Sequence, residues 1–429
     1  MSFTLPGLPS DLLTSDRFDD RRLKVAGPVT VERGPNLDAF GRLRVSQPTA
    51  IWYNTLQYDS SPLLWSEQIA GNATSEHSYE DSGMVMSVLG EGDKVTRTVR
   101  QPIRYQPGKS RLDVLTWGLP NIGEGVRFRA GAFTSQDGIF CQIHDGAFSF
   151  GVRSSVSGAV VDTLIPQADW NIDRLDGTGP SGIALNPAAG HILLTDLQWL
   201  SLGVIRFGFE LDGELFYAHQ TSTANVITRP YMQTANLPIR YEIESFGGAG
   251  SVVAICSASV SEGGNAAEQG INFSASAPRT GKDVAATDAW TPLVSIRRAN
   301  LFKGRPYYSA QITPTKFATF ATGQTLQFGV FYRPTLTGPT WAAVNAESGV
   351  EFDTAATAMT GGILSDAFYV AAGGQGGGAF STATGADTVW LLPLASDTEG
   401  GDQDIVTIAA RGITGAGTGY AAIDYREVR

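Results

Sequence analysis

Hydrophobic and polar residues alternate along most of the chain, and the clearest alternation lies between residues 204 and 220. Every second residue from Ile205 to Leu211 is apolar, and Asp212-Gly213 separates this run from a second alternating run. Period-two alternation predicts strands, and an Asp-Gly pair favours a type I′ hairpin turn. We therefore expect a β-hairpin with one buried apolar face. The predicted facing pairs are Leu211 with Glu214, Phe209 with Phe216, and Phe207 with Ala218.

A second hairpin of the same kind is predicted between residues 139 and 152. Two alternating runs again meet at an Asp-Gly pair, Asp145-Gly146. The predicted facing pairs are Ile143 with Phe148, Cys141 with Phe150, and Ile139 with Val152. Because each hairpin has one apolar face, we expect sheets that are packed on one side.

Length and composition extend this pattern to the whole chain. The 429 residues exceed one ordinary core, and 50 glycines with only 17% charged residues favour strands and tight turns over helices. We predict an all-β protein with two jelly-roll-like β-sandwich domains, preceded by an extended N-terminal arm. The predicted divisions are an arm over 1–50, a concanavalin-like sandwich over 51–262, a linker over 263–285 and a C-terminal sandwich over 286–429.

The N-terminal segment has prolines that break long elements, and a short helix over residues 11–23 is one expectation. Two interpretations of the segment stay open: an unstructured tail, or an assembly arm that orders on a neighbouring subunit. The apolar residues favour the arm because a solvated tail does not need them. These residues are Leu12, Leu13, Phe18, Leu23 and Val25.

Several stretches resemble a family of tailed-bacteriophage virion structural proteins. They are DAFGRLRVSQP (38–48), PQADWNIDRLDGTGPSGIALNP (166–187), ILLTDLQWLSLGVIRFGFELDGELFYAHQ (192–220) and YMQTANLPIRYEIE (231–244). The order of strands, polar loop and aromatic hairpin also resembles concanavalin-like and laminin-G-like sandwiches. The resemblance covers residues 36–260 well and the C-terminal part more loosely.

This resemblance implies a virion component, made in the bacterial host cytoplasm, that acts through subunit interfaces. The position can be the tail, a tail fibre or the capsid surface, where the protein would be a decoration protein. The implied partners are capsid, tail or neck subunits and further copies of the chain, for example in a trimer. The alternative function is a carbohydrate-binding protein that recognises a receptor glycan on the host surface.

Motifs for catalysis or cofactor binding are not found in the sequence. His77, His144, His191 and His219 lack metal-ligand spacing, and no GxSxG, P-loop or HExxH motif occurs. In the hairpin model His219 faces Arg206. A glycosidase needs two carboxylates across a cleft, and 42 acidic residues leave that alternative open. We expect no enzymatic activity, no metal and no cofactor.

Candidate ligand contacts are aromatic or acidic. Trp170 could stack on a sugar, and Asp169, Asp173 and Asp176 could gather oxygens around Ca²⁺, although a capped polar turn explains the same spacing. Further candidate stacking residues are Trp52, Trp65 and Tyr217.

Charge and hydropathy exclude other classes. A net charge of −11 argues against a nucleic-acid partner. No apolar run reaches the roughly 18 residues of a membrane span, and the first residues predict no signal peptide. Cys141 and Cys256 lie in apolar runs, so free thiols are expected.

Overall fold

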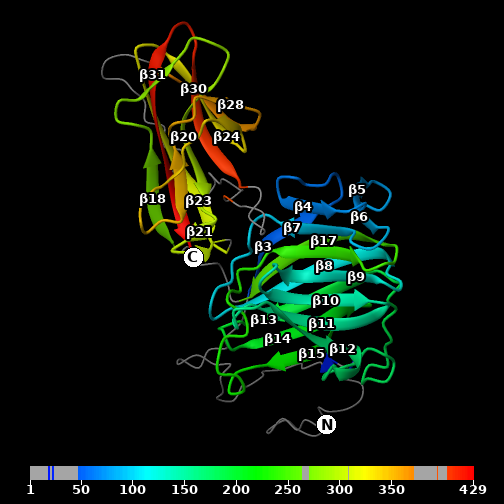
Figure 1. The fold of residues 1–429 in the computed structure, drawn as a ribbon. Coiled ribbons are helices and arrows are strands. Elements are labelled where there is room, and N and C mark those ends of the chain that lie inside the picture. The colour runs from blue at the N-terminus through cyan, green and yellow to red at the C-terminus, as the bar shows by residue number, and fades with distance from the viewer. Residues whose placement is uncertain are drawn as a thin grey trace. The chain divides into compact units, whose positions relative to one another are not determined.

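The computed structural model describes residues 47–262, 270–307, 309–371, 394 and 403–429, together with the backbone of 18–19 and 22–23. Almost all regular structure in these residues is β (Figure 1). A single-turn 3₁₀ helix, η3 (Gln167–Asp169), follows one of the edge strands. No helix in the described part of the chain is long and apolar enough to cross a membrane.

The first sandwich is built from two antiparallel sheets. The seven-stranded sheet has the order β12 (Val161–Pro166), β11 (Ala147–Ser154), β10 (Gly138–His144), β9 (Val126–Phe133), β16 (Ile239–Ser245), β7 (Lys94–Val99) and β4 (Trp65–Ala70). The eight-stranded sheet has the order β15 (Glu214–Ser222), β14 (Val204–Leu211), β13 (His191–Leu197), β8 (Ser110–Asn121), β17 (Gly250–Glu262), β6 (Gly83–Val88) and β5 (Thr74–Ser78), and β3 (Pro48–Thr55) also pairs with β17.

Both predicted Asp-Gly hairpins are present. Asp145 and Asp212 have φ values of 50° and 56°, and the following glycines also have positive φ, as a type I′ turn requires. All three facing pairs predicted for β10 and β11 are confirmed. In β14 and β15 the pairs nearest the turn, Leu211 with Glu214 and Phe209 with Phe216, are also confirmed.

The third predicted pair in the β14–β15 hairpin is wrong because the register shifts. A β-bulge between Phe207 and Gly208 places His219, not Ala218, opposite Phe207. Gly208 passes so close to β15 that a Cβ there would lie 2.3 Å from the carbonyl oxygen of Phe216. The expected contact of His219 with Arg206 is also wrong, since Arg206 pairs with Gln220 and His219 is buried.

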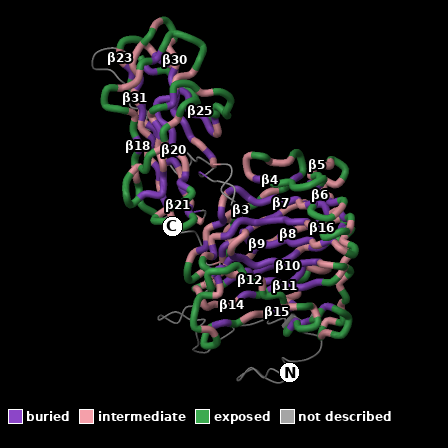
Figure 2. The backbone as a smooth tube through the Cα atoms, in the orientation of Figure 1, coloured by how far each residue is buried: buried purple, intermediate pink, exposed green. Residues whose placement is uncertain are grey.

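The two hairpins lie in different sheets, and their apolar faces meet in the core. Phe150 of β11 stacks on Phe207 of β14, with ring centroids 4.5 Å apart, and on Trp170, at 4.2 Å. Figure 2 shows buried backbone running along the central strands of this sandwich, while the connections are exposed. The core is therefore a layer of aromatic and aliphatic side chains between two one-sided sheets.

The second sandwich also has two sheets with a hydrophobic core of its own. One sheet contains β18 (Ile271–Ser276), β31 (Gly417–Val428) and β19 (Lys282–Val284), with β23 (Gln311–Thr322) also pairing with β31. The other has the order β26 (Ala342–Ala343), β27 (Val350–Asp353), β20 (Thr291–Arg298), β30 (Ile405–Gly412), β24 (Leu326–Tyr332) and β29 (Ile363–Val370). Three short pairs complete the described strands: β1 (Phe18–Asp19) with β2 (Arg22–Leu23), β21 (Leu301–Phe302) with β22 (Arg305–Pro306), and β25 (Thr335–Thr337) with β28 (Ala358–Thr360).

The strand pairing corrects two predictions, the linker and the N-terminal helix. The predicted linker 263–285 contains β18 and β19, which pair with the long β31, so these two strands belong to the second sandwich, and residues 263–269 lie outside the described residues. The short apolar alternation of β18, with Phe273 packed on the core, explains why its residues form a strand. In the segment 11–23, for which a helix is one expectation, the described residues form the β1–β2 pair. The last residues of the predicted arm, 48–50, begin β3 and pair with β17, so they belong to the first sandwich. Residues 1–17, 20–21 and 24–46 lie outside the described residues.

Candidate functional site

The outer face of the seven-stranded sheet carries charged side chains from neighbouring strands. Along β16, Ile239, Tyr241 and Ile243 enter the core, so Arg240, Glu242 and Glu244 lie on the opposite face. Along β9, Arg127 and Arg129 alternate in the same way with core residues. The register aligns them, with Glu242 opposite Arg129 and Glu244 opposite Arg127.

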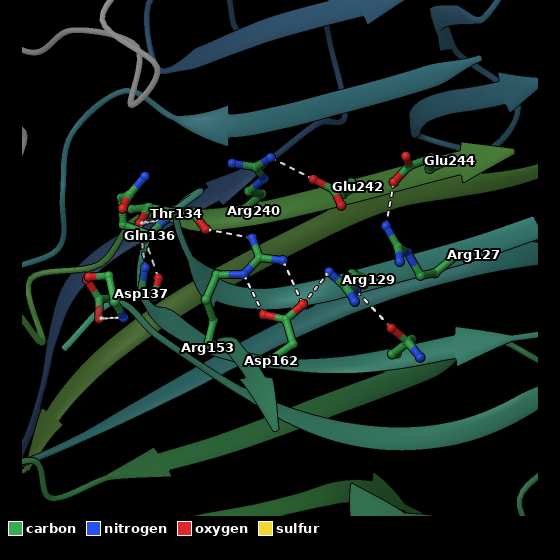
Figure 3. Close-up of polar contacts among 12 residues, drawn as sticks. Arg127, Arg129, Thr134, Gln136, Asp137, Arg153, Asp162, Arg240, Glu242 and Glu244 are labelled. Atoms are coloured by element: carbon green, nitrogen blue, oxygen red, sulfur yellow. Dashed lines mark hydrogen bonds and ion pairs between the residues drawn. The ribbon is translucent and has the colours of Figure 1, made fainter. Parts of the chain in front are cut away.

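A pocket of about 590 Å³ opens on this face. Its lining is mainly polar: Gln68, Ile69, Ala70, Lys94, Thr96, Arg127, Ser135, Arg153, Val160, Arg240, Glu242 and Glu244. We call the eight ionisable residues of this region the charged face: Lys94, Arg127, Arg129, Arg153, Asp162, Arg240, Glu242 and Glu244. Figure 3 shows these residues except Lys94. The charged face lies on β7, β9, β11, β12 and β16 of this sheet, in which β10 separates β11 from β9.

Ion pairs fix the two glutamates of β16. Arg240 donates from Nη2 to Glu242 Oε2 at 2.6 Å, and Lys94 Nζ lies 3.3 Å from the same oxygen. Lys94 Nζ is also 3.6 Å from Glu244 Oε2, to which Arg127 donates from Nη2. Lys94 therefore lies between the two carboxylates, and each carboxylate has a second, guanidinium partner.

The cations keep Glu242 ionised. Burial by itself would raise the pKa of Glu242, which is 2% exposed, but Arg240 and Lys94 together lower it to about 2. A carboxyl group with such a pKa holds no proton at neutral pH. Glu242 therefore cannot serve as the general acid that protonates a leaving group in glycoside hydrolysis.

Asp162 and a buried aromatic ring hold the remaining arginines. Asp162 accepts two hydrogen bonds from Arg153, at 2.7 and 2.9 Å, and lies 3.1 Å from Arg129 Nη1. Both guanidinium groups lie over the ring of Phe140, at 4.5 Å for Arg129 and 5.7 Å for Arg153. Burial, together with the nearby Arg127, lowers the pKa of Arg129 to about 10.

The β9–β10 connection forms one end of the pocket. Arg153 Nη1 donates to the carbonyl oxygen of Thr134 at 2.9 Å. Asp137 accepts from the backbone and hydroxyl of Ser155, at 3.1 and 2.8 Å, and from the backbone of Gln233. These bonds hold the backbone at Thr134 and Asp137 (Figure 3), on both sides of Ser135. Ser135 lines the pocket.

The chemistry that this arrangement supports is binding of a polar ligand. The amide, hydroxyl, guanidinium and carboxylate groups that line the pocket can donate and accept many hydrogen bonds from fixed positions. Next to it, the ring of Phe246 is 49% exposed, with the Arg127 guanidinium 4.9 Å from its centroid. Phe246 thus offers an apolar surface beside the charged groups.

The prediction that Trp170 stacks on a sugar is wrong because the side chain is buried. Trp170 is only 4% exposed, since its ring stacks on Phe150 in the core and its Nε1 donates to the carbonyl oxygen of Ile165. Similarly, Trp65 is buried and donates to Asn54, and Trp52 packs against it. Tyr217 lies under Arg206 on the other sheet.

Asp173 and Asp176 accept hydrogen bonds from residues of their own loop, 169–182. Asp173 accepts from the backbone N–H groups of Leu175 and Ser181, and Asp176 accepts from Thr178. Asp169 lies exposed in η3. Among the residues that the structure describes, no group of His, Cys, Asp or Glu could hold a metal ion. The capped-turn alternative therefore explains the loop.

The arm residues Leu12, Leu13 and Val25 lie outside the described residues. Phe18 and Leu23 fall in β1 and β2, where only the backbone pairing is described. The prediction that these five residues bind a neighbouring subunit stays a prediction. Cys141 and Cys256 are free thiols, as expected.

Sequence reasoning missed the charged face. The available signal was charge alternating with apolar residues inside strands, as in VRFR (126–129) and IRYEIE (239–244). On a sheet with one apolar face, such residues must share the other face. The pattern does not predict that β16 pairs with β9, because the two strands are more than 100 residues apart in sequence.

Comparisons with known proteins identify no family and find solved structures of low similarity. No family model matches the sequence, and no curated protein matches it either. Among solved structures, a Bacillus licheniformis β-glucanase is 11% identical, with a TM-score of 0.31, over 51% of this chain and 99% of that chain. A glycosyl hydrolase family protein from Mycobacterium fortuitum is 11% identical, with a TM-score of 0.34, over 49% and 99%.

The receptor-binding domain of a botulinum neurotoxin C/D mosaic serotype is 9% identical, with a TM-score of 0.31, over 49% of this chain and 47% of that chain. At such TM-scores these similarities carry no argument about activity. The assignment as an all-β sandwich rests on the sheets, and the candidate site rests on its own geometry.

Proposed function

We propose that the first sandwich is a saccharide-binding module that recognises a host surface glycan for a tailed-phage virion. The observation that carries this proposal is the polar pocket of about 590 Å³ on the outer face of the seven-stranded sheet. A saccharide presents many hydroxyl groups that both donate and accept, which suits a surface of fixed polar groups.

Two further features favour a saccharide over another polar ligand. The charged side chains are held by one another, so little conformational entropy is lost when a ligand binds. The half-exposed ring of Phe246 lies beside Arg127, where the apolar face of a sugar ring could pack. We propose binding without hydrolysis, and Glu242, which is held ionised, does not supply the general acid of a glycosidase at this pocket.

Isothermal titration of the purified chain with surface polysaccharide from the bacterial host tests this function. We expect saturable binding and an unchanged polysaccharide chain length after incubation. An absence of binding heat and of any retention on the immobilised polysaccharide would contradict a saccharide-binding function.

A structural role in the virion is the second candidate, and it is compatible with the first. The resemblance of residues 36–260 to phage structural proteins supports it, as does β29. This strand ends the described six-stranded sheet and exposes Ile363, Leu364 and Tyr369. Strand addition at such an edge is a common route to subunit contact.

Limited proteolysis tests the assembly role of the N-terminal arm. If residues 1–35 order on a neighbouring subunit, protease should remove them from the free chain and spare them in assembled particles. The rest of the chain serves as the internal control. Equal cleavage in both states would contradict the arm hypothesis.

A further inference from the structure

We propose that the ligand of the charged face is an anionic saccharide, whose acidic group pairs with Arg127. This inference rests on the proposed saccharide-binding function and adds the chemical class of the sugar. The acidic group would be a carboxylate, as in a uronic acid, placed where Arg127 and Lys94 meet the pocket.

The balance of charge at the site supports an anion. Five cationic side chains of the charged face meet three carboxylates there, so the site has an excess of two positive charges. The whole chain, in contrast, carries a net charge of −11. A local cationic site in an acidic protein attracts anions to that site.

Arg127 has the capacity to take a new partner. Among the described residues its guanidinium has one hydrogen-bond partner, Glu244, to which Nη2 donates. The Arg127 side chain is still 23% exposed and lines the pocket. A carboxylate that displaces Glu244 from Nη2 can take the two terminal N–H groups, on Nη1 and Nη2, while the buried Nε takes no part. Two parallel N–H groups are the geometry in which arginine binds acids most strongly.

The neighbouring ion pairs allow this exchange without an unpaired charge. Glu244 has two cationic partners, Arg127 and Lys94. If a ligand carboxylate takes Arg127, Glu244 keeps Lys94. Arg153, in contrast, is held at both ends by Asp162 and the Thr134 carbonyl, so it serves as a fixed wall of the pocket.

The experiment uses an array of acidic bacterial polysaccharides, each printed beside its carboxyl-reduced form. Reduction replaces each carboxylate by a hydroxymethyl group and keeps the sugar skeleton. The full chain is compared with Arg127→Gln, Arg127→Lys and Glu244→Gln. Arg206→Gln is the matched control, because Arg206 is also a strand arginine with an acidic neighbour, but on the other sheet.

We expect binding to acidic spots that falls about tenfold or more on reduction, as loss of a charge-assisted bond predicts. Arg127→Gln should lose a similar factor, and Arg127→Lys should recover only part of it. Glu244→Gln should bind more tightly, because a competing carboxylate is removed, and Arg206→Gln should match the unchanged chain. If Arg127 had only a structural role, removing its partner by Glu244→Gln would also weaken binding. Tighter binding by Glu244→Gln therefore distinguishes ligand contact from a structural role.

Two other results would each overturn a different claim. Equal binding to acidic and reduced spots would overturn the anionic class and leave saccharide binding intact. Binding to no spot at all would overturn the saccharide-binding function itself. Thermal unfolding of each variant identifies any loss of binding that comes from misfolding.

Discussion

Glu242 illustrates at the scale of one residue how the charged face is held together. Its carboxylate is buried on the outer side of β16, where desolvation disfavours charge, and Arg240 and Lys94 reverse that preference. A buried ion pair of this kind adds little stability compared with apolar packing, but breaking one partner is costly. The pair therefore fixes geometry more than it stabilises the fold.

Replacing Glu242 by Gln should destabilise the first sandwich by about 3 kcal/mol at neutral pH, because the Arg240 cation then lacks its carboxylate. The folded-state pKa of Glu242 is lowered to about 2 from 4.5, so the stabilisation is present above pH 4.5 and is lost as the pH falls towards 2. The difference between the two proteins should fall by about half near pH 3. Urea denaturation of both proteins between pH 7 and pH 3 measures this difference in the free energy of unfolding.

A difference in stability that does not change between pH 7 and pH 3 would contradict the assignment of a paired, ionised Glu242. Glu262→Gln is a suitable control, since Glu262 is a half-exposed strand glutamate on the other sheet. Its effect on the free energy of unfolding should stay small at every pH.

At the scale of the element, the hairpins were predictable and the bulge was not. Asp-Gly turns and period-two alternation act within about ten residues, so the sequence contains the whole signal for β10–β11. The bulge in β14 depends on the close approach of Gly208 to the carbonyl of Phe216, which only the paired strand creates. The burial of Trp170 was not predictable for a similar reason, because it depends on stacking against Phe150 of the β10–β11 hairpin.

Phe209 gives the test of the buried hairpin face. It is fully buried between the sheets, so Phe209→Ala should destabilise the first sandwich by about 3–5 kcal/mol. Phe246→Ala is the matched control, because Phe246 is half-exposed and its main partner is Arg127; about 1 kcal/mol or less is expected. Urea denaturation followed by tryptophan fluorescence distinguishes the two. Equal losses of stability would mean that the core has been assigned to the wrong face.

At the scale of the molecule, the fold class was predictable because it follows from patterns repeated in every segment. The candidate site was not, because it is assembled by long-range pairing. Lys94, Arg127, Arg153 and Glu244 come from four strands of one sheet, and β16 lies between β7 and β9 although it follows them by more than 100 residues. Strand order decides which charged residues meet, and no local pattern in this sequence contains that order.

The central claim is that the pocket on the charged face is where a host glycan binds. Ala70 is exposed at the edge strand β4 and lines this pocket, so Ala70→Trp places an indole in part of the pocket without removing a polar group. Ala343→Trp, on the exposed strand β26 of the second sandwich, controls for the added indole. The most direct measurement is calorimetric titration of both variants with host surface polysaccharide. We predict that Ala70→Trp weakens binding by about tenfold or more while Ala343→Trp leaves it unchanged. Unchanged binding by a folded Ala70→Trp variant would contradict the claim.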